Sequence, residues 1–324
     1  MTEKLRRRLA EHAPGRANLR TRLLAAGLGG GQHRSERRGS GVEFAGHREY
    51  YPGDDLRHLD RHALLRHGRH LIREFHSETE RALWLVVDGS ASMSYRGEGQ
   101  AESKLGTALL LAGGLALLTR SSADPLGLCL LGTAAPGLPP RAGLPHVEHV
   151  LSELDALDAL DGGDSSESQP LDADALTRLF VPRLAHVAQR AKRGSTLVVL
   201  SDLLDPEGSW WRELPILAGG RRRLVVVQVL DRSEVEFSLR GSLRLRDPES
   251  GAIVDTEGER ARQGYLRALA AHTDSIEREV ASRGGAFLRL ITDEPLTQSF
   301  LRLRLAIQGA ATPFEVDATG GGSA

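Results

Sequence analysis

Four short runs of apolar residues place the strongest constraint on how this 324-residue chain can fold. The runs read ALWLVV, LGLCLL, TLVVLS and LVVVQVL, and stretches long enough to hold helices separate them. Strands that are apolar at nearly every position are buried on both faces, which is typical of a parallel sheet covered by helices on each side. The sequence therefore predicts an α/β fold with a Rossmann-like, mostly parallel sheet.

The remaining segments add helices and one hairpin to this sheet. Apolar spacing predicts helices over residues 103–119, 145–157, 172–192, 210–218, 260–282 and 296–306. Residues 242–255 read as a β-hairpin that turns at PESG, and AFLRLI reads as a further strand. The longest apolar stretch, LGTALLLAGGLALL, falls short of the roughly 20 residues that cross a bilayer. We expect a buried helix there and no membrane span.

Composition changes along the chain predict three parts. Residues 1–80 are polar, rich in Gly, Arg and His, and weakly periodic, so we expect a smaller, irregular or β-rich unit. Residues 81–306 hold the α/β domain with the hairpin near 242–255 inserted, and residues 307–324 read as a flexible tail. The start, MTEKLRRRLAEHAPGR, lacks the apolar core of an export signal, and Cys129 is the only cysteine. These features favour the cytoplasm.

Charge and histidine spacing exclude some classes of partner. The chain has 42 Lys and Arg against 43 Asp and Glu, so no overall field favours nucleic acid, and no nucleic-acid partner is expected. His58 and His62 have the spacing of a helical zinc pair, but no H-E-x-x-H motif accompanies them. In a segment this rich in histidine we attribute the spacing to chance.

The first apolar run ends in the segment LVVDGSASMS, which carries the best candidate site. Asp88, Ser90 and Ser92 follow a strand at its carboxyl end, where open α/β sheets bind their ligands. Asp202 ends the run TLVVLSD in the same way. Carboxylate and hydroxyl oxygens suit a hard cation, so these four residues form a candidate Mg²⁺ site. The alternative is that they are ordinary helix caps and turn residues.

These motifs resemble two known patterns. Asp88, Ser90 and Ser92, together with Asp202, resemble the metal-ion-dependent adhesion site of von Willebrand factor A domains. The segment GSGVEFAGHREYYPGDDLRHLD, at residues 39–60, resembles the hallmark of the bacterial family called domain of unknown function 58. The later segments VLDRSEVEF, LRLRDPESGAIVDT and TDEPL are similar to that family as well, so the resemblance extends over residues 31–303.

The resemblance implies a function, and at one position the chain departs from the pattern of A domains. It implies a non-enzymatic protein-binding module that works with a MoxR-type AAA+ ATPase in chaperoning or assembly of client complexes. In A domains a threonine from a third loop usually completes the metal shell, and Leu171 stands at the corresponding place here. Leucine cannot bind a cation, which leaves Asp172, Ser168 and Asp164 as substitutes.

Two other classes of function stay open from the sequence. A degenerate A-type domain that binds partners without metal fits the missing threonine. A phosphotransfer enzyme with Asp88 as its nucleophile would place a second aspartate at position 90, where this chain has serine. The segment GSASM also lacks the second glycine of a G-x-S-x-G nucleophile elbow, so we predict that the protein is not an enzyme.

Overall fold

The chain forms two compact units, which are described separately below. One unit comprises Met1–Gly30 and Arg81–Ala324, and the other comprises Gly31–Glu80. The computed structural model describes residues 5, 7–9, 38–39, 43–50, 59–60, 63, 70–76, 81–122, 124–135, 137–161, 173–205 and 210–309.

A six-stranded sheet forms the centre of the larger unit. Its strands are β4 (Leu83–Asp88), β5 (Leu126–Leu131), β6 (Leu138–Arg141), β7 (Thr196–Ser201), β8 (Arg223–Leu230) and β11 (Ala286–Ile291). They lie in the order β11-β8-β7-β4-β5-β6, and every neighbouring pair is parallel except β5 and β6. The four apolar runs form β4, β5, β7 and β8, so the predicted mostly parallel α/β sheet is confirmed.

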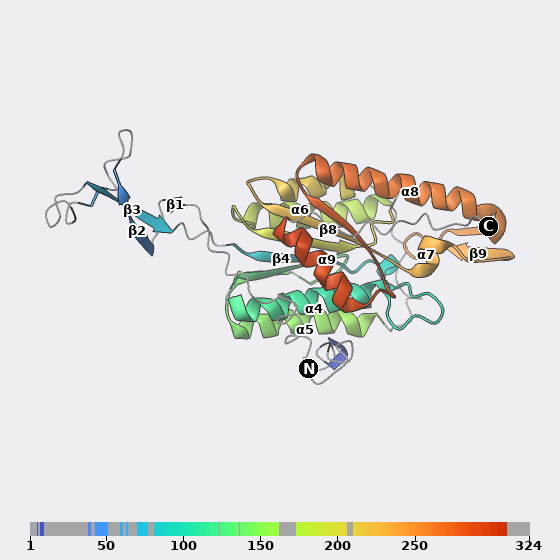
Figure 1. Ribbon diagram of the computed structural model, residues 1–324. Coiled ribbons are helices and arrows are strands. Elements are labelled where there is room, and N and C mark those ends of the chain that lie inside the picture. The colour runs from blue at the N-terminus through green and yellow to red at the C-terminus, as the bar shows by residue number, and fades with distance from the viewer. Residues whose placement is uncertain are drawn as a thin grey trace, which may run out of the picture. The chain divides into compact units, whose positions relative to one another are not determined.

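Both faces of the sheet are covered by helices (Figure 1). Alternate side chains of β4 point to opposite faces: Leu85 and Val87 belong to one buried cluster, and Trp84 and Val86 to the other. The first cluster is completed by α4 (Lys104–Ser122), α5 (Leu144–Leu160) and α9 (Leu296–Gln308). The second is completed by α6 (Ala173–Arg190), the 3₁₀ helix η4 (Trp210–Ala218) and α8 (Gly258–Ser282). Each predicted helix is confirmed to within a few residues.

The smaller unit ends at Glu80, where composition predicts a boundary, but it begins at Gly31 and not at residue 1. Leu5 and Leu9 are buried in the same cluster as α4 and α5, so the first 30 residues group with the larger unit. Leu5 and Leu9 are four residues apart, a spacing that places both side chains on one face of a helix. At the other end α9 continues to Gln308, and residues 310–324 of the predicted tail lie outside the described residues.

The smaller unit contains an antiparallel sheet. Strand β3 (Leu71–His76) lies between β1 (Arg38–Gly39) and β2 (Glu43–Glu49), with a bulge between Phe44 and Gly46. Asp60 is buried, and its carboxylate accepts the backbone N–H of Ala63 at 3.1 Å. The described part of residues 31–80 is therefore rich in β-structure, as predicted.

Three smaller elements complete the larger unit. Strands β9 (Ser242–Arg246) and β10 (Ile253–Glu257) form a separate hairpin between β8 and α8, which confirms the predicted insertion. The helix α7 (Arg232–Glu236) and the edge strand β6 were not predicted. The sequence of β6, LPPR, contains two prolines that lack N–H groups, and such residues are tolerated only at a sheet edge.

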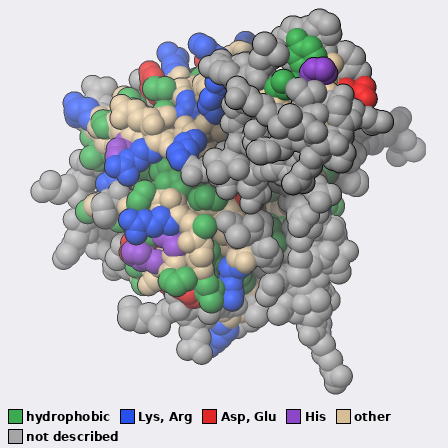
Figure 2. All heavy atoms as spheres, turned by 90° about the vertical axis from the view of Figure 1, so that its left-hand side faces the viewer, with side chains coloured by type: hydrophobic (Ala, Val, Ile, Leu, Met, Phe, Trp, Pro, Cys, Tyr) green, Lys and Arg blue, Asp and Glu red, His purple; other side chains and the backbone are tan. Residues whose placement is uncertain are grey.

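Figure 2 views the larger unit from the side away from α7 and the hairpin, and residues that the structure does not describe cover part of this side. Figure 2 shows Lys and Arg side chains spread among apolar and other polar groups on this side. None of the described helices combines the length and the apolar character that a bilayer-spanning helix requires.

We predict that Gly114→Ala in α4 destabilises the larger unit. A Cβ atom at Gly114 would lie 2.0 Å from the ring of Phe300 in α9, so the two helices would have to separate. Overpacking of this kind costs about 1–3 kcal/mol of unfolding free energy. The control is Gly264→Ala in α8, where a Cβ atom meets nothing within 4 Å and should stabilise by about 0.5–1 kcal/mol. Urea denaturation of both variants measures the difference, and equal effects would contradict the packing described here.

Candidate functional site

The carboxyl ends of β4 and β7 bring the first candidate residues together. The two strands are parallel neighbours with Val87 opposite Leu200, so Asp88 and Ser201 follow side by side. The Ser201 hydroxyl donates to Oδ2 of Asp88 at 2.6 Å, and the backbone N–H of Ser90 donates to Oδ1 at 2.9 Å. Asp88 is therefore buried and held in one orientation by hydrogen bonds to both oxygens.

Ser90 and Ser92 place two hydroxyl groups beside Asp88. They flank the start of the 3₁₀ helix η2 (Ala91–Ser94), and their Oγ atoms lie 3.3 Å apart. Two adjacent ligands of an octahedral ion at about 2.1 Å lie about 3 Å from each other. The spacing of the two hydroxyl oxygens therefore fits a shared Mg²⁺ ion.

Asp202 lies at the same edge, at the end of β7. Its Oδ1 accepts the backbone N–H of Leu204 at 3.1 Å, and its own N–H faces the sulfur of Met93 at 3.1 Å. Its negative charge acts on Asp88, where it contributes to a raised pKa. The structure thus gathers Asp88, Ser90, Ser92 and Asp202 at one edge of the sheet, as their positions after strands predicted.

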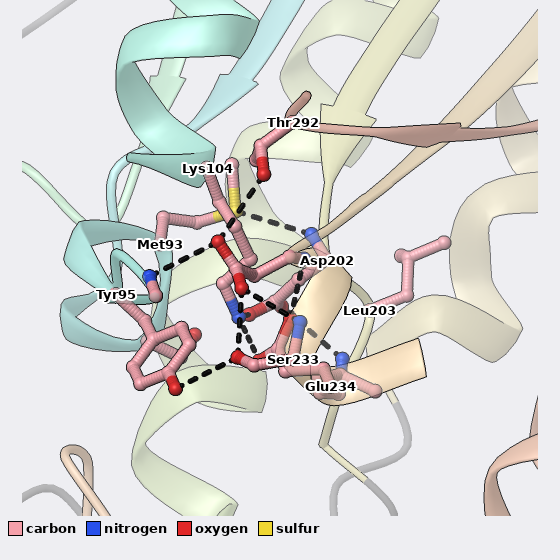
Figure 3. Close-up of polar contacts among 12 residues, drawn as sticks. Met93, Tyr95, Lys104, Asp202, Leu203, Ser233, Glu234 and Thr292 are labelled. Atoms are coloured by element: carbon pink, nitrogen blue, oxygen red, sulfur yellow. Dashed lines mark hydrogen bonds and ion pairs between the residues drawn. The ribbon is translucent and has the colours of Figure 1, made fainter. Parts of the chain in front are cut away.

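A buried lysine that sequence reasoning missed contacts this group. The Nζ atom of Lys104, the first residue of α4, lies 2.8 Å from Oδ2 of Asp202 and 2.6 Å from Oε1 of Glu234. The ammonium also lies 5.6 Å from the ring centroid of Tyr95 (Figure 3). Burial alone would lower the pKa of Lys104, but the charges of Asp202 and Glu234 outweigh it and raise that pKa. Lys104 is therefore a permanent cation at the site.

A signal for this lysine is present in the sequence. The chain holds 42 Lys and Arg residues, and only Lys4, Lys104 and Lys192 are lysines. Lys104 directly precedes the long apolar stretch of α4, where a solvated charge is not expected. A compact ammonium fits between two carboxylates where the larger, planar guanidinium of arginine requires a different geometry.

Helix α7 positions Glu234 against the lysine. Asp231 at the end of β8 accepts the N–H of Ser233 at 2.9 Å, while Glu234 Oε2 accepts the N–H of Asp231 at 2.8 Å, which completes a capping box. The hydroxyls of Tyr95 and Ser233 lie 2.9 Å apart, and Thr292 donates to Asp231 at 3.2 Å (Figure 3). The spacing D-x-x-E, residues 231–234, is a sequence signal for this helix.

The β9–β10 hairpin contributes a further acidic residue. Oε1 of Glu249, at the hairpin tip, accepts the backbone N–H of Ser92 at 2.8 Å. The two residues are 157 positions apart, so no local pattern links them. Glu249 is half-buried, and burial raises its pKa although the Ser92 N–H opposes the rise.

The electrostatics of the site show a shortage of positive charge. Burial raises the pKa of Asp88 to about 7, and the charge of Asp202 adds to this, while hydrogen bonds from Ser201 and Ser90 oppose it. Burial also raises the pKa of Glu234 despite its contact with Lys104. In the described part of the chain, Asp202 and Glu234 form their ion pairs with the same residue, Lys104. Several carboxylates thus share a single ammonium.

The described residues do not supply a conventional metal cluster. Within that part of the chain, no three His, Cys, Asp or Glu side chains converge on a common point. The donor set around Asp88 instead combines hydroxyls with carboxylates, which suits a hydrated hard cation and not zinc. The candidate third-loop residues (Asp164, Ser168, Leu171 and Asp172) and the histidine pair (His58 and His62) lie outside the described residues.

Comparison with known proteins places the chain in a family. Residues 46–275 match the family described as "Protein of unknown function DUF58". The chain belongs to the DUF58 family. The uncharacterized protein Rv1480 of Mycobacterium tuberculosis is 29% identical to this DUF58 protein over 266 residues, which cover 82% of this chain and 79% of that protein. An uncharacterized protein of Mycobacterium bovis, Mb1516, has the same identity and coverage.

Two solved structures resemble this DUF58 protein at lower similarity. An aerotolerance-related membrane protein from Bacteroides fragilis has 16% identity and a TM-score of 0.40, covering 71% of this chain and 99% of its own. The conserved hypothetical protein BatB from Bacteroides thetaiotaomicron has 17% identity and the same TM-score, with 71% and 98% coverage. The family membership rests on the sequence match to DUF58.

We predict that Lys104→Met destabilises the larger unit by about 3–5 kcal/mol, because it leaves the carboxylates of Asp202 and Glu234 without their buried cation. Chemical denaturation measures the loss. The matched control is Lys192→Met, which removes an exposed lysine and should change the unfolding free energy much less. Adding Glu234→Gln to Lys104→Met should recover part of the loss, and no recovery would argue against this ion-pair account.

We also predict a pH-dependent difference between the wild type and Asp88→Asn. Because the folded-state pKa of Asp88 is raised to about 7 from an ordinary value near 4, its contribution to stability is fully present below pH 4 and is lost as the pH rises through 7. Each pKa unit corresponds to about 1.4 kcal/mol. In EDTA, the wild type should therefore lose more unfolding free energy than Asp88→Asn between pH 5.5 and pH 8. Parallel pH profiles from urea denaturation would refute this.

Proposed function

We propose that the larger unit is a von Willebrand factor A-type domain of Rossmann-like topology that acts as a protein-binding module. In this proposal Asp88, Ser90, Ser92 and Asp202 hold a Mg²⁺ ion at the carboxyl edge of the sheet. The module is not an enzyme and acts in the cytoplasm. The proposal extends the DUF58 membership, which by itself specifies no function.

One observation carries the proposal: a pair of hydroxyls at a suitable spacing lies within a site whose carboxylates outnumber its single ammonium, that of Lys104. The Oγ atoms of Ser90 and Ser92 are 3.3 Å apart, and Asp88 beside them has a pKa of about 7. A divalent cation would favour the ionised form of Asp88 and relieve its repulsion with Asp202. The residues present therefore fit a hard cation that keeps part of its water shell.

The site suits the capture of an acidic partner. A bound Mg²⁺ ion with an open coordination position supplies a point of attachment for one carboxylate oxygen. The protein's own residues set the geometry: Ser201 and the Ser90 N–H fix the orientation of Asp88, and Lys104 fixes that of Asp202. For the partner, we propose a MoxR-type AAA+ ATPase, with a client complex as the object of chaperoning or assembly. The resemblance of the sequence motifs supports this choice.

A second candidate is a degenerate A-type domain that binds partners without metal. Its support is the ammonium of Lys104, which already neutralises part of the charge of Asp202 at 2.8 Å. By contrast, a phosphotransfer enzyme with Asp88 as its nucleophile is disfavoured because position 90, where such an enzyme would carry a second aspartate, is serine.

We predict that Mg²⁺ stabilises the wild-type protein and that Asp88→Ala removes this effect. Loss of one charged ligand should weaken the affinity for Mg²⁺ by at least tenfold, which corresponds to about 1.4 kcal/mol. Isothermal titration with MgCl₂ measures the affinity, and a melting curve in EDTA confirms that the variant folds. The control is Asp255→Asn, which removes an exposed carboxylate of the hairpin.

A pull-down with a MoxR-type ATPase from the same genome tests the partner. Capture by the wild type in Mg²⁺ that is lost in EDTA and in Asp88→Ala would support the cation-dependent module. Capture that persists both in EDTA and with the Asp88→Ala variant would favour the metal-free domain. An absence of capture under every condition would remove the ATPase from the proposal.

A further inference from the structure

The β9–β10 hairpin is a stiff arm with little burial of its own. Its strands are exposed or half-exposed along their length. Arg244 and Asp255 form a cross-strand ion pair at 2.8 Å, and Ser242 donates to Glu257 at 2.7 Å. These exposed pairs contribute little stability individually, but they favour one pairing register of the arm.

The turn at the end of the arm holds Glu249 in a defined place. The carboxylate of Asp247 accepts the N–H of Glu249 at 2.9 Å, and the Asp247 carbonyl accepts the N–H of Gly251 at 2.9 Å. Gly251 has φ of 70°, a left-handed conformation that favours glycine. The turn residues Asp247, Pro248 and Ser250 are exposed, whereas Glu249 is half-buried. The tip therefore points one carboxylate inward.

That carboxylate reaches the loop of the candidate cation site. Glu249 Oε1 accepts the N–H of Ser92 at 2.8 Å, and the Ser92 hydroxyl is one of the two proposed cation ligands. A carboxylate that binds a cation held by Ser90 and Ser92 has to approach the same loop. Glu249 already has the chemistry that the site is proposed to recognise in a partner.

The base of the arm is formed by Gly241 and Gly258, and the Gly241 N–H donates to the carboxylate of Glu259 at 3.1 Å. At its base, Gly241 has φ of 71°, and no atom lies within 4 Å of a Cβ built there. The other strand joins α8 at Gly258, whose N–H donates to the Gly241 carbonyl at 2.8 Å. Displacement of the tip would require a backbone change in the few residues at this base.

We propose that Glu249 is a tethered occupant of the partner position, so that an acidic partner must displace the hairpin tip to bind. This inference rests on the proposed function and adds a control to the same site. A tethered group is present at a high effective concentration, so even a weak contact can compete with a free ligand. If the tip is docked in nine of ten molecules, removing it tightens the apparent affinity for the partner about tenfold.

The test compares Glu249→Ala and Glu249→Gln with the wild type in the full chain. The probe is a short fluorescein-labelled peptide with a single glutamate, and its glutamine counterpart is the reference ligand. Fluorescence polarisation in MgCl₂ should show about tenfold tighter binding of the glutamate peptide to Glu249→Ala and a smaller gain for Glu249→Gln, whose amide oxygen can still accept the Ser92 N–H. Glu277→Gln removes the same charge from an exposed position of α8, outside the hairpin, and it should bind as the wild type does.

Two further measurements separate the tether from the cation site. Calorimetry should give the Glu249 variants the same affinity for Mg²⁺ as the wild type; a loss of Mg²⁺ affinity would make Glu249 a cation ligand and overturn the tether. Unchanged or weaker peptide binding by both variants, or equal gains in Glu277→Gln, would also overturn it. If the gain from Glu249→Ala persists in EDTA and no protein binds Mg²⁺, the tether is supported and the cation proposal fails.

Discussion

The burial of the central sheet on both faces restricts where this protein can place polar groups. Side chains of β4, β7 and β8 pack against helices on alternate sides, so the interiors of these strands are apolar. Each of the three strands is then followed or ended by an aspartate, at Asp88, Asp202 and Asp231. Because the strands are parallel neighbours, these aspartates lie at a single edge. The concentration of acidic groups there follows directly from the topology.

The three aspartates have different hydrogen-bond and ion-pair partners, so they differ in pKa and in how far their charge is neutralised. Asp231 caps α7 and accepts several N–H and hydroxyl donors, which together hold its pKa below the ordinary value against the effect of burial. Asp202 binds the ammonium of Lys104. Among the described residues, Asp88 accepts hydrogen bonds from the neutral donors of Ser90 and Ser201, and burial raises its pKa. An added cation would therefore be favoured beside the carboxylate of Asp88, where the hydroxyls of Ser90 and Ser92 supply further oxygen ligands.

The sequence allows the sheet and half of the site to be predicted, for a physical reason. Continuous apolar runs report burial on both faces, and a polar residue at the end of such a run marks the strand's carboxyl end, as at Asp88 and Asp202. The contacts of Lys104 with Asp202 and of Glu249 with Ser92 join positions 98 and 157 residues apart. Such contacts depend on the packing of α4 and on the length of the hairpin, which periodicity does not encode.

Lys104 and Glu249 are both charged groups of the chain that approach the candidate site, but they differ in their freedom to leave. The ammonium of Lys104 is buried between two carboxylates, and moving it would leave both without a cation. Glu249 is half-exposed on an arm that makes few buried contacts, so its departure costs much less. In the proposed scheme, the carboxylate of an acidic partner therefore replaces Glu249 and does not replace Lys104. The buried lysine keeps Asp202 in place while the exposed edge of the site changes its occupant.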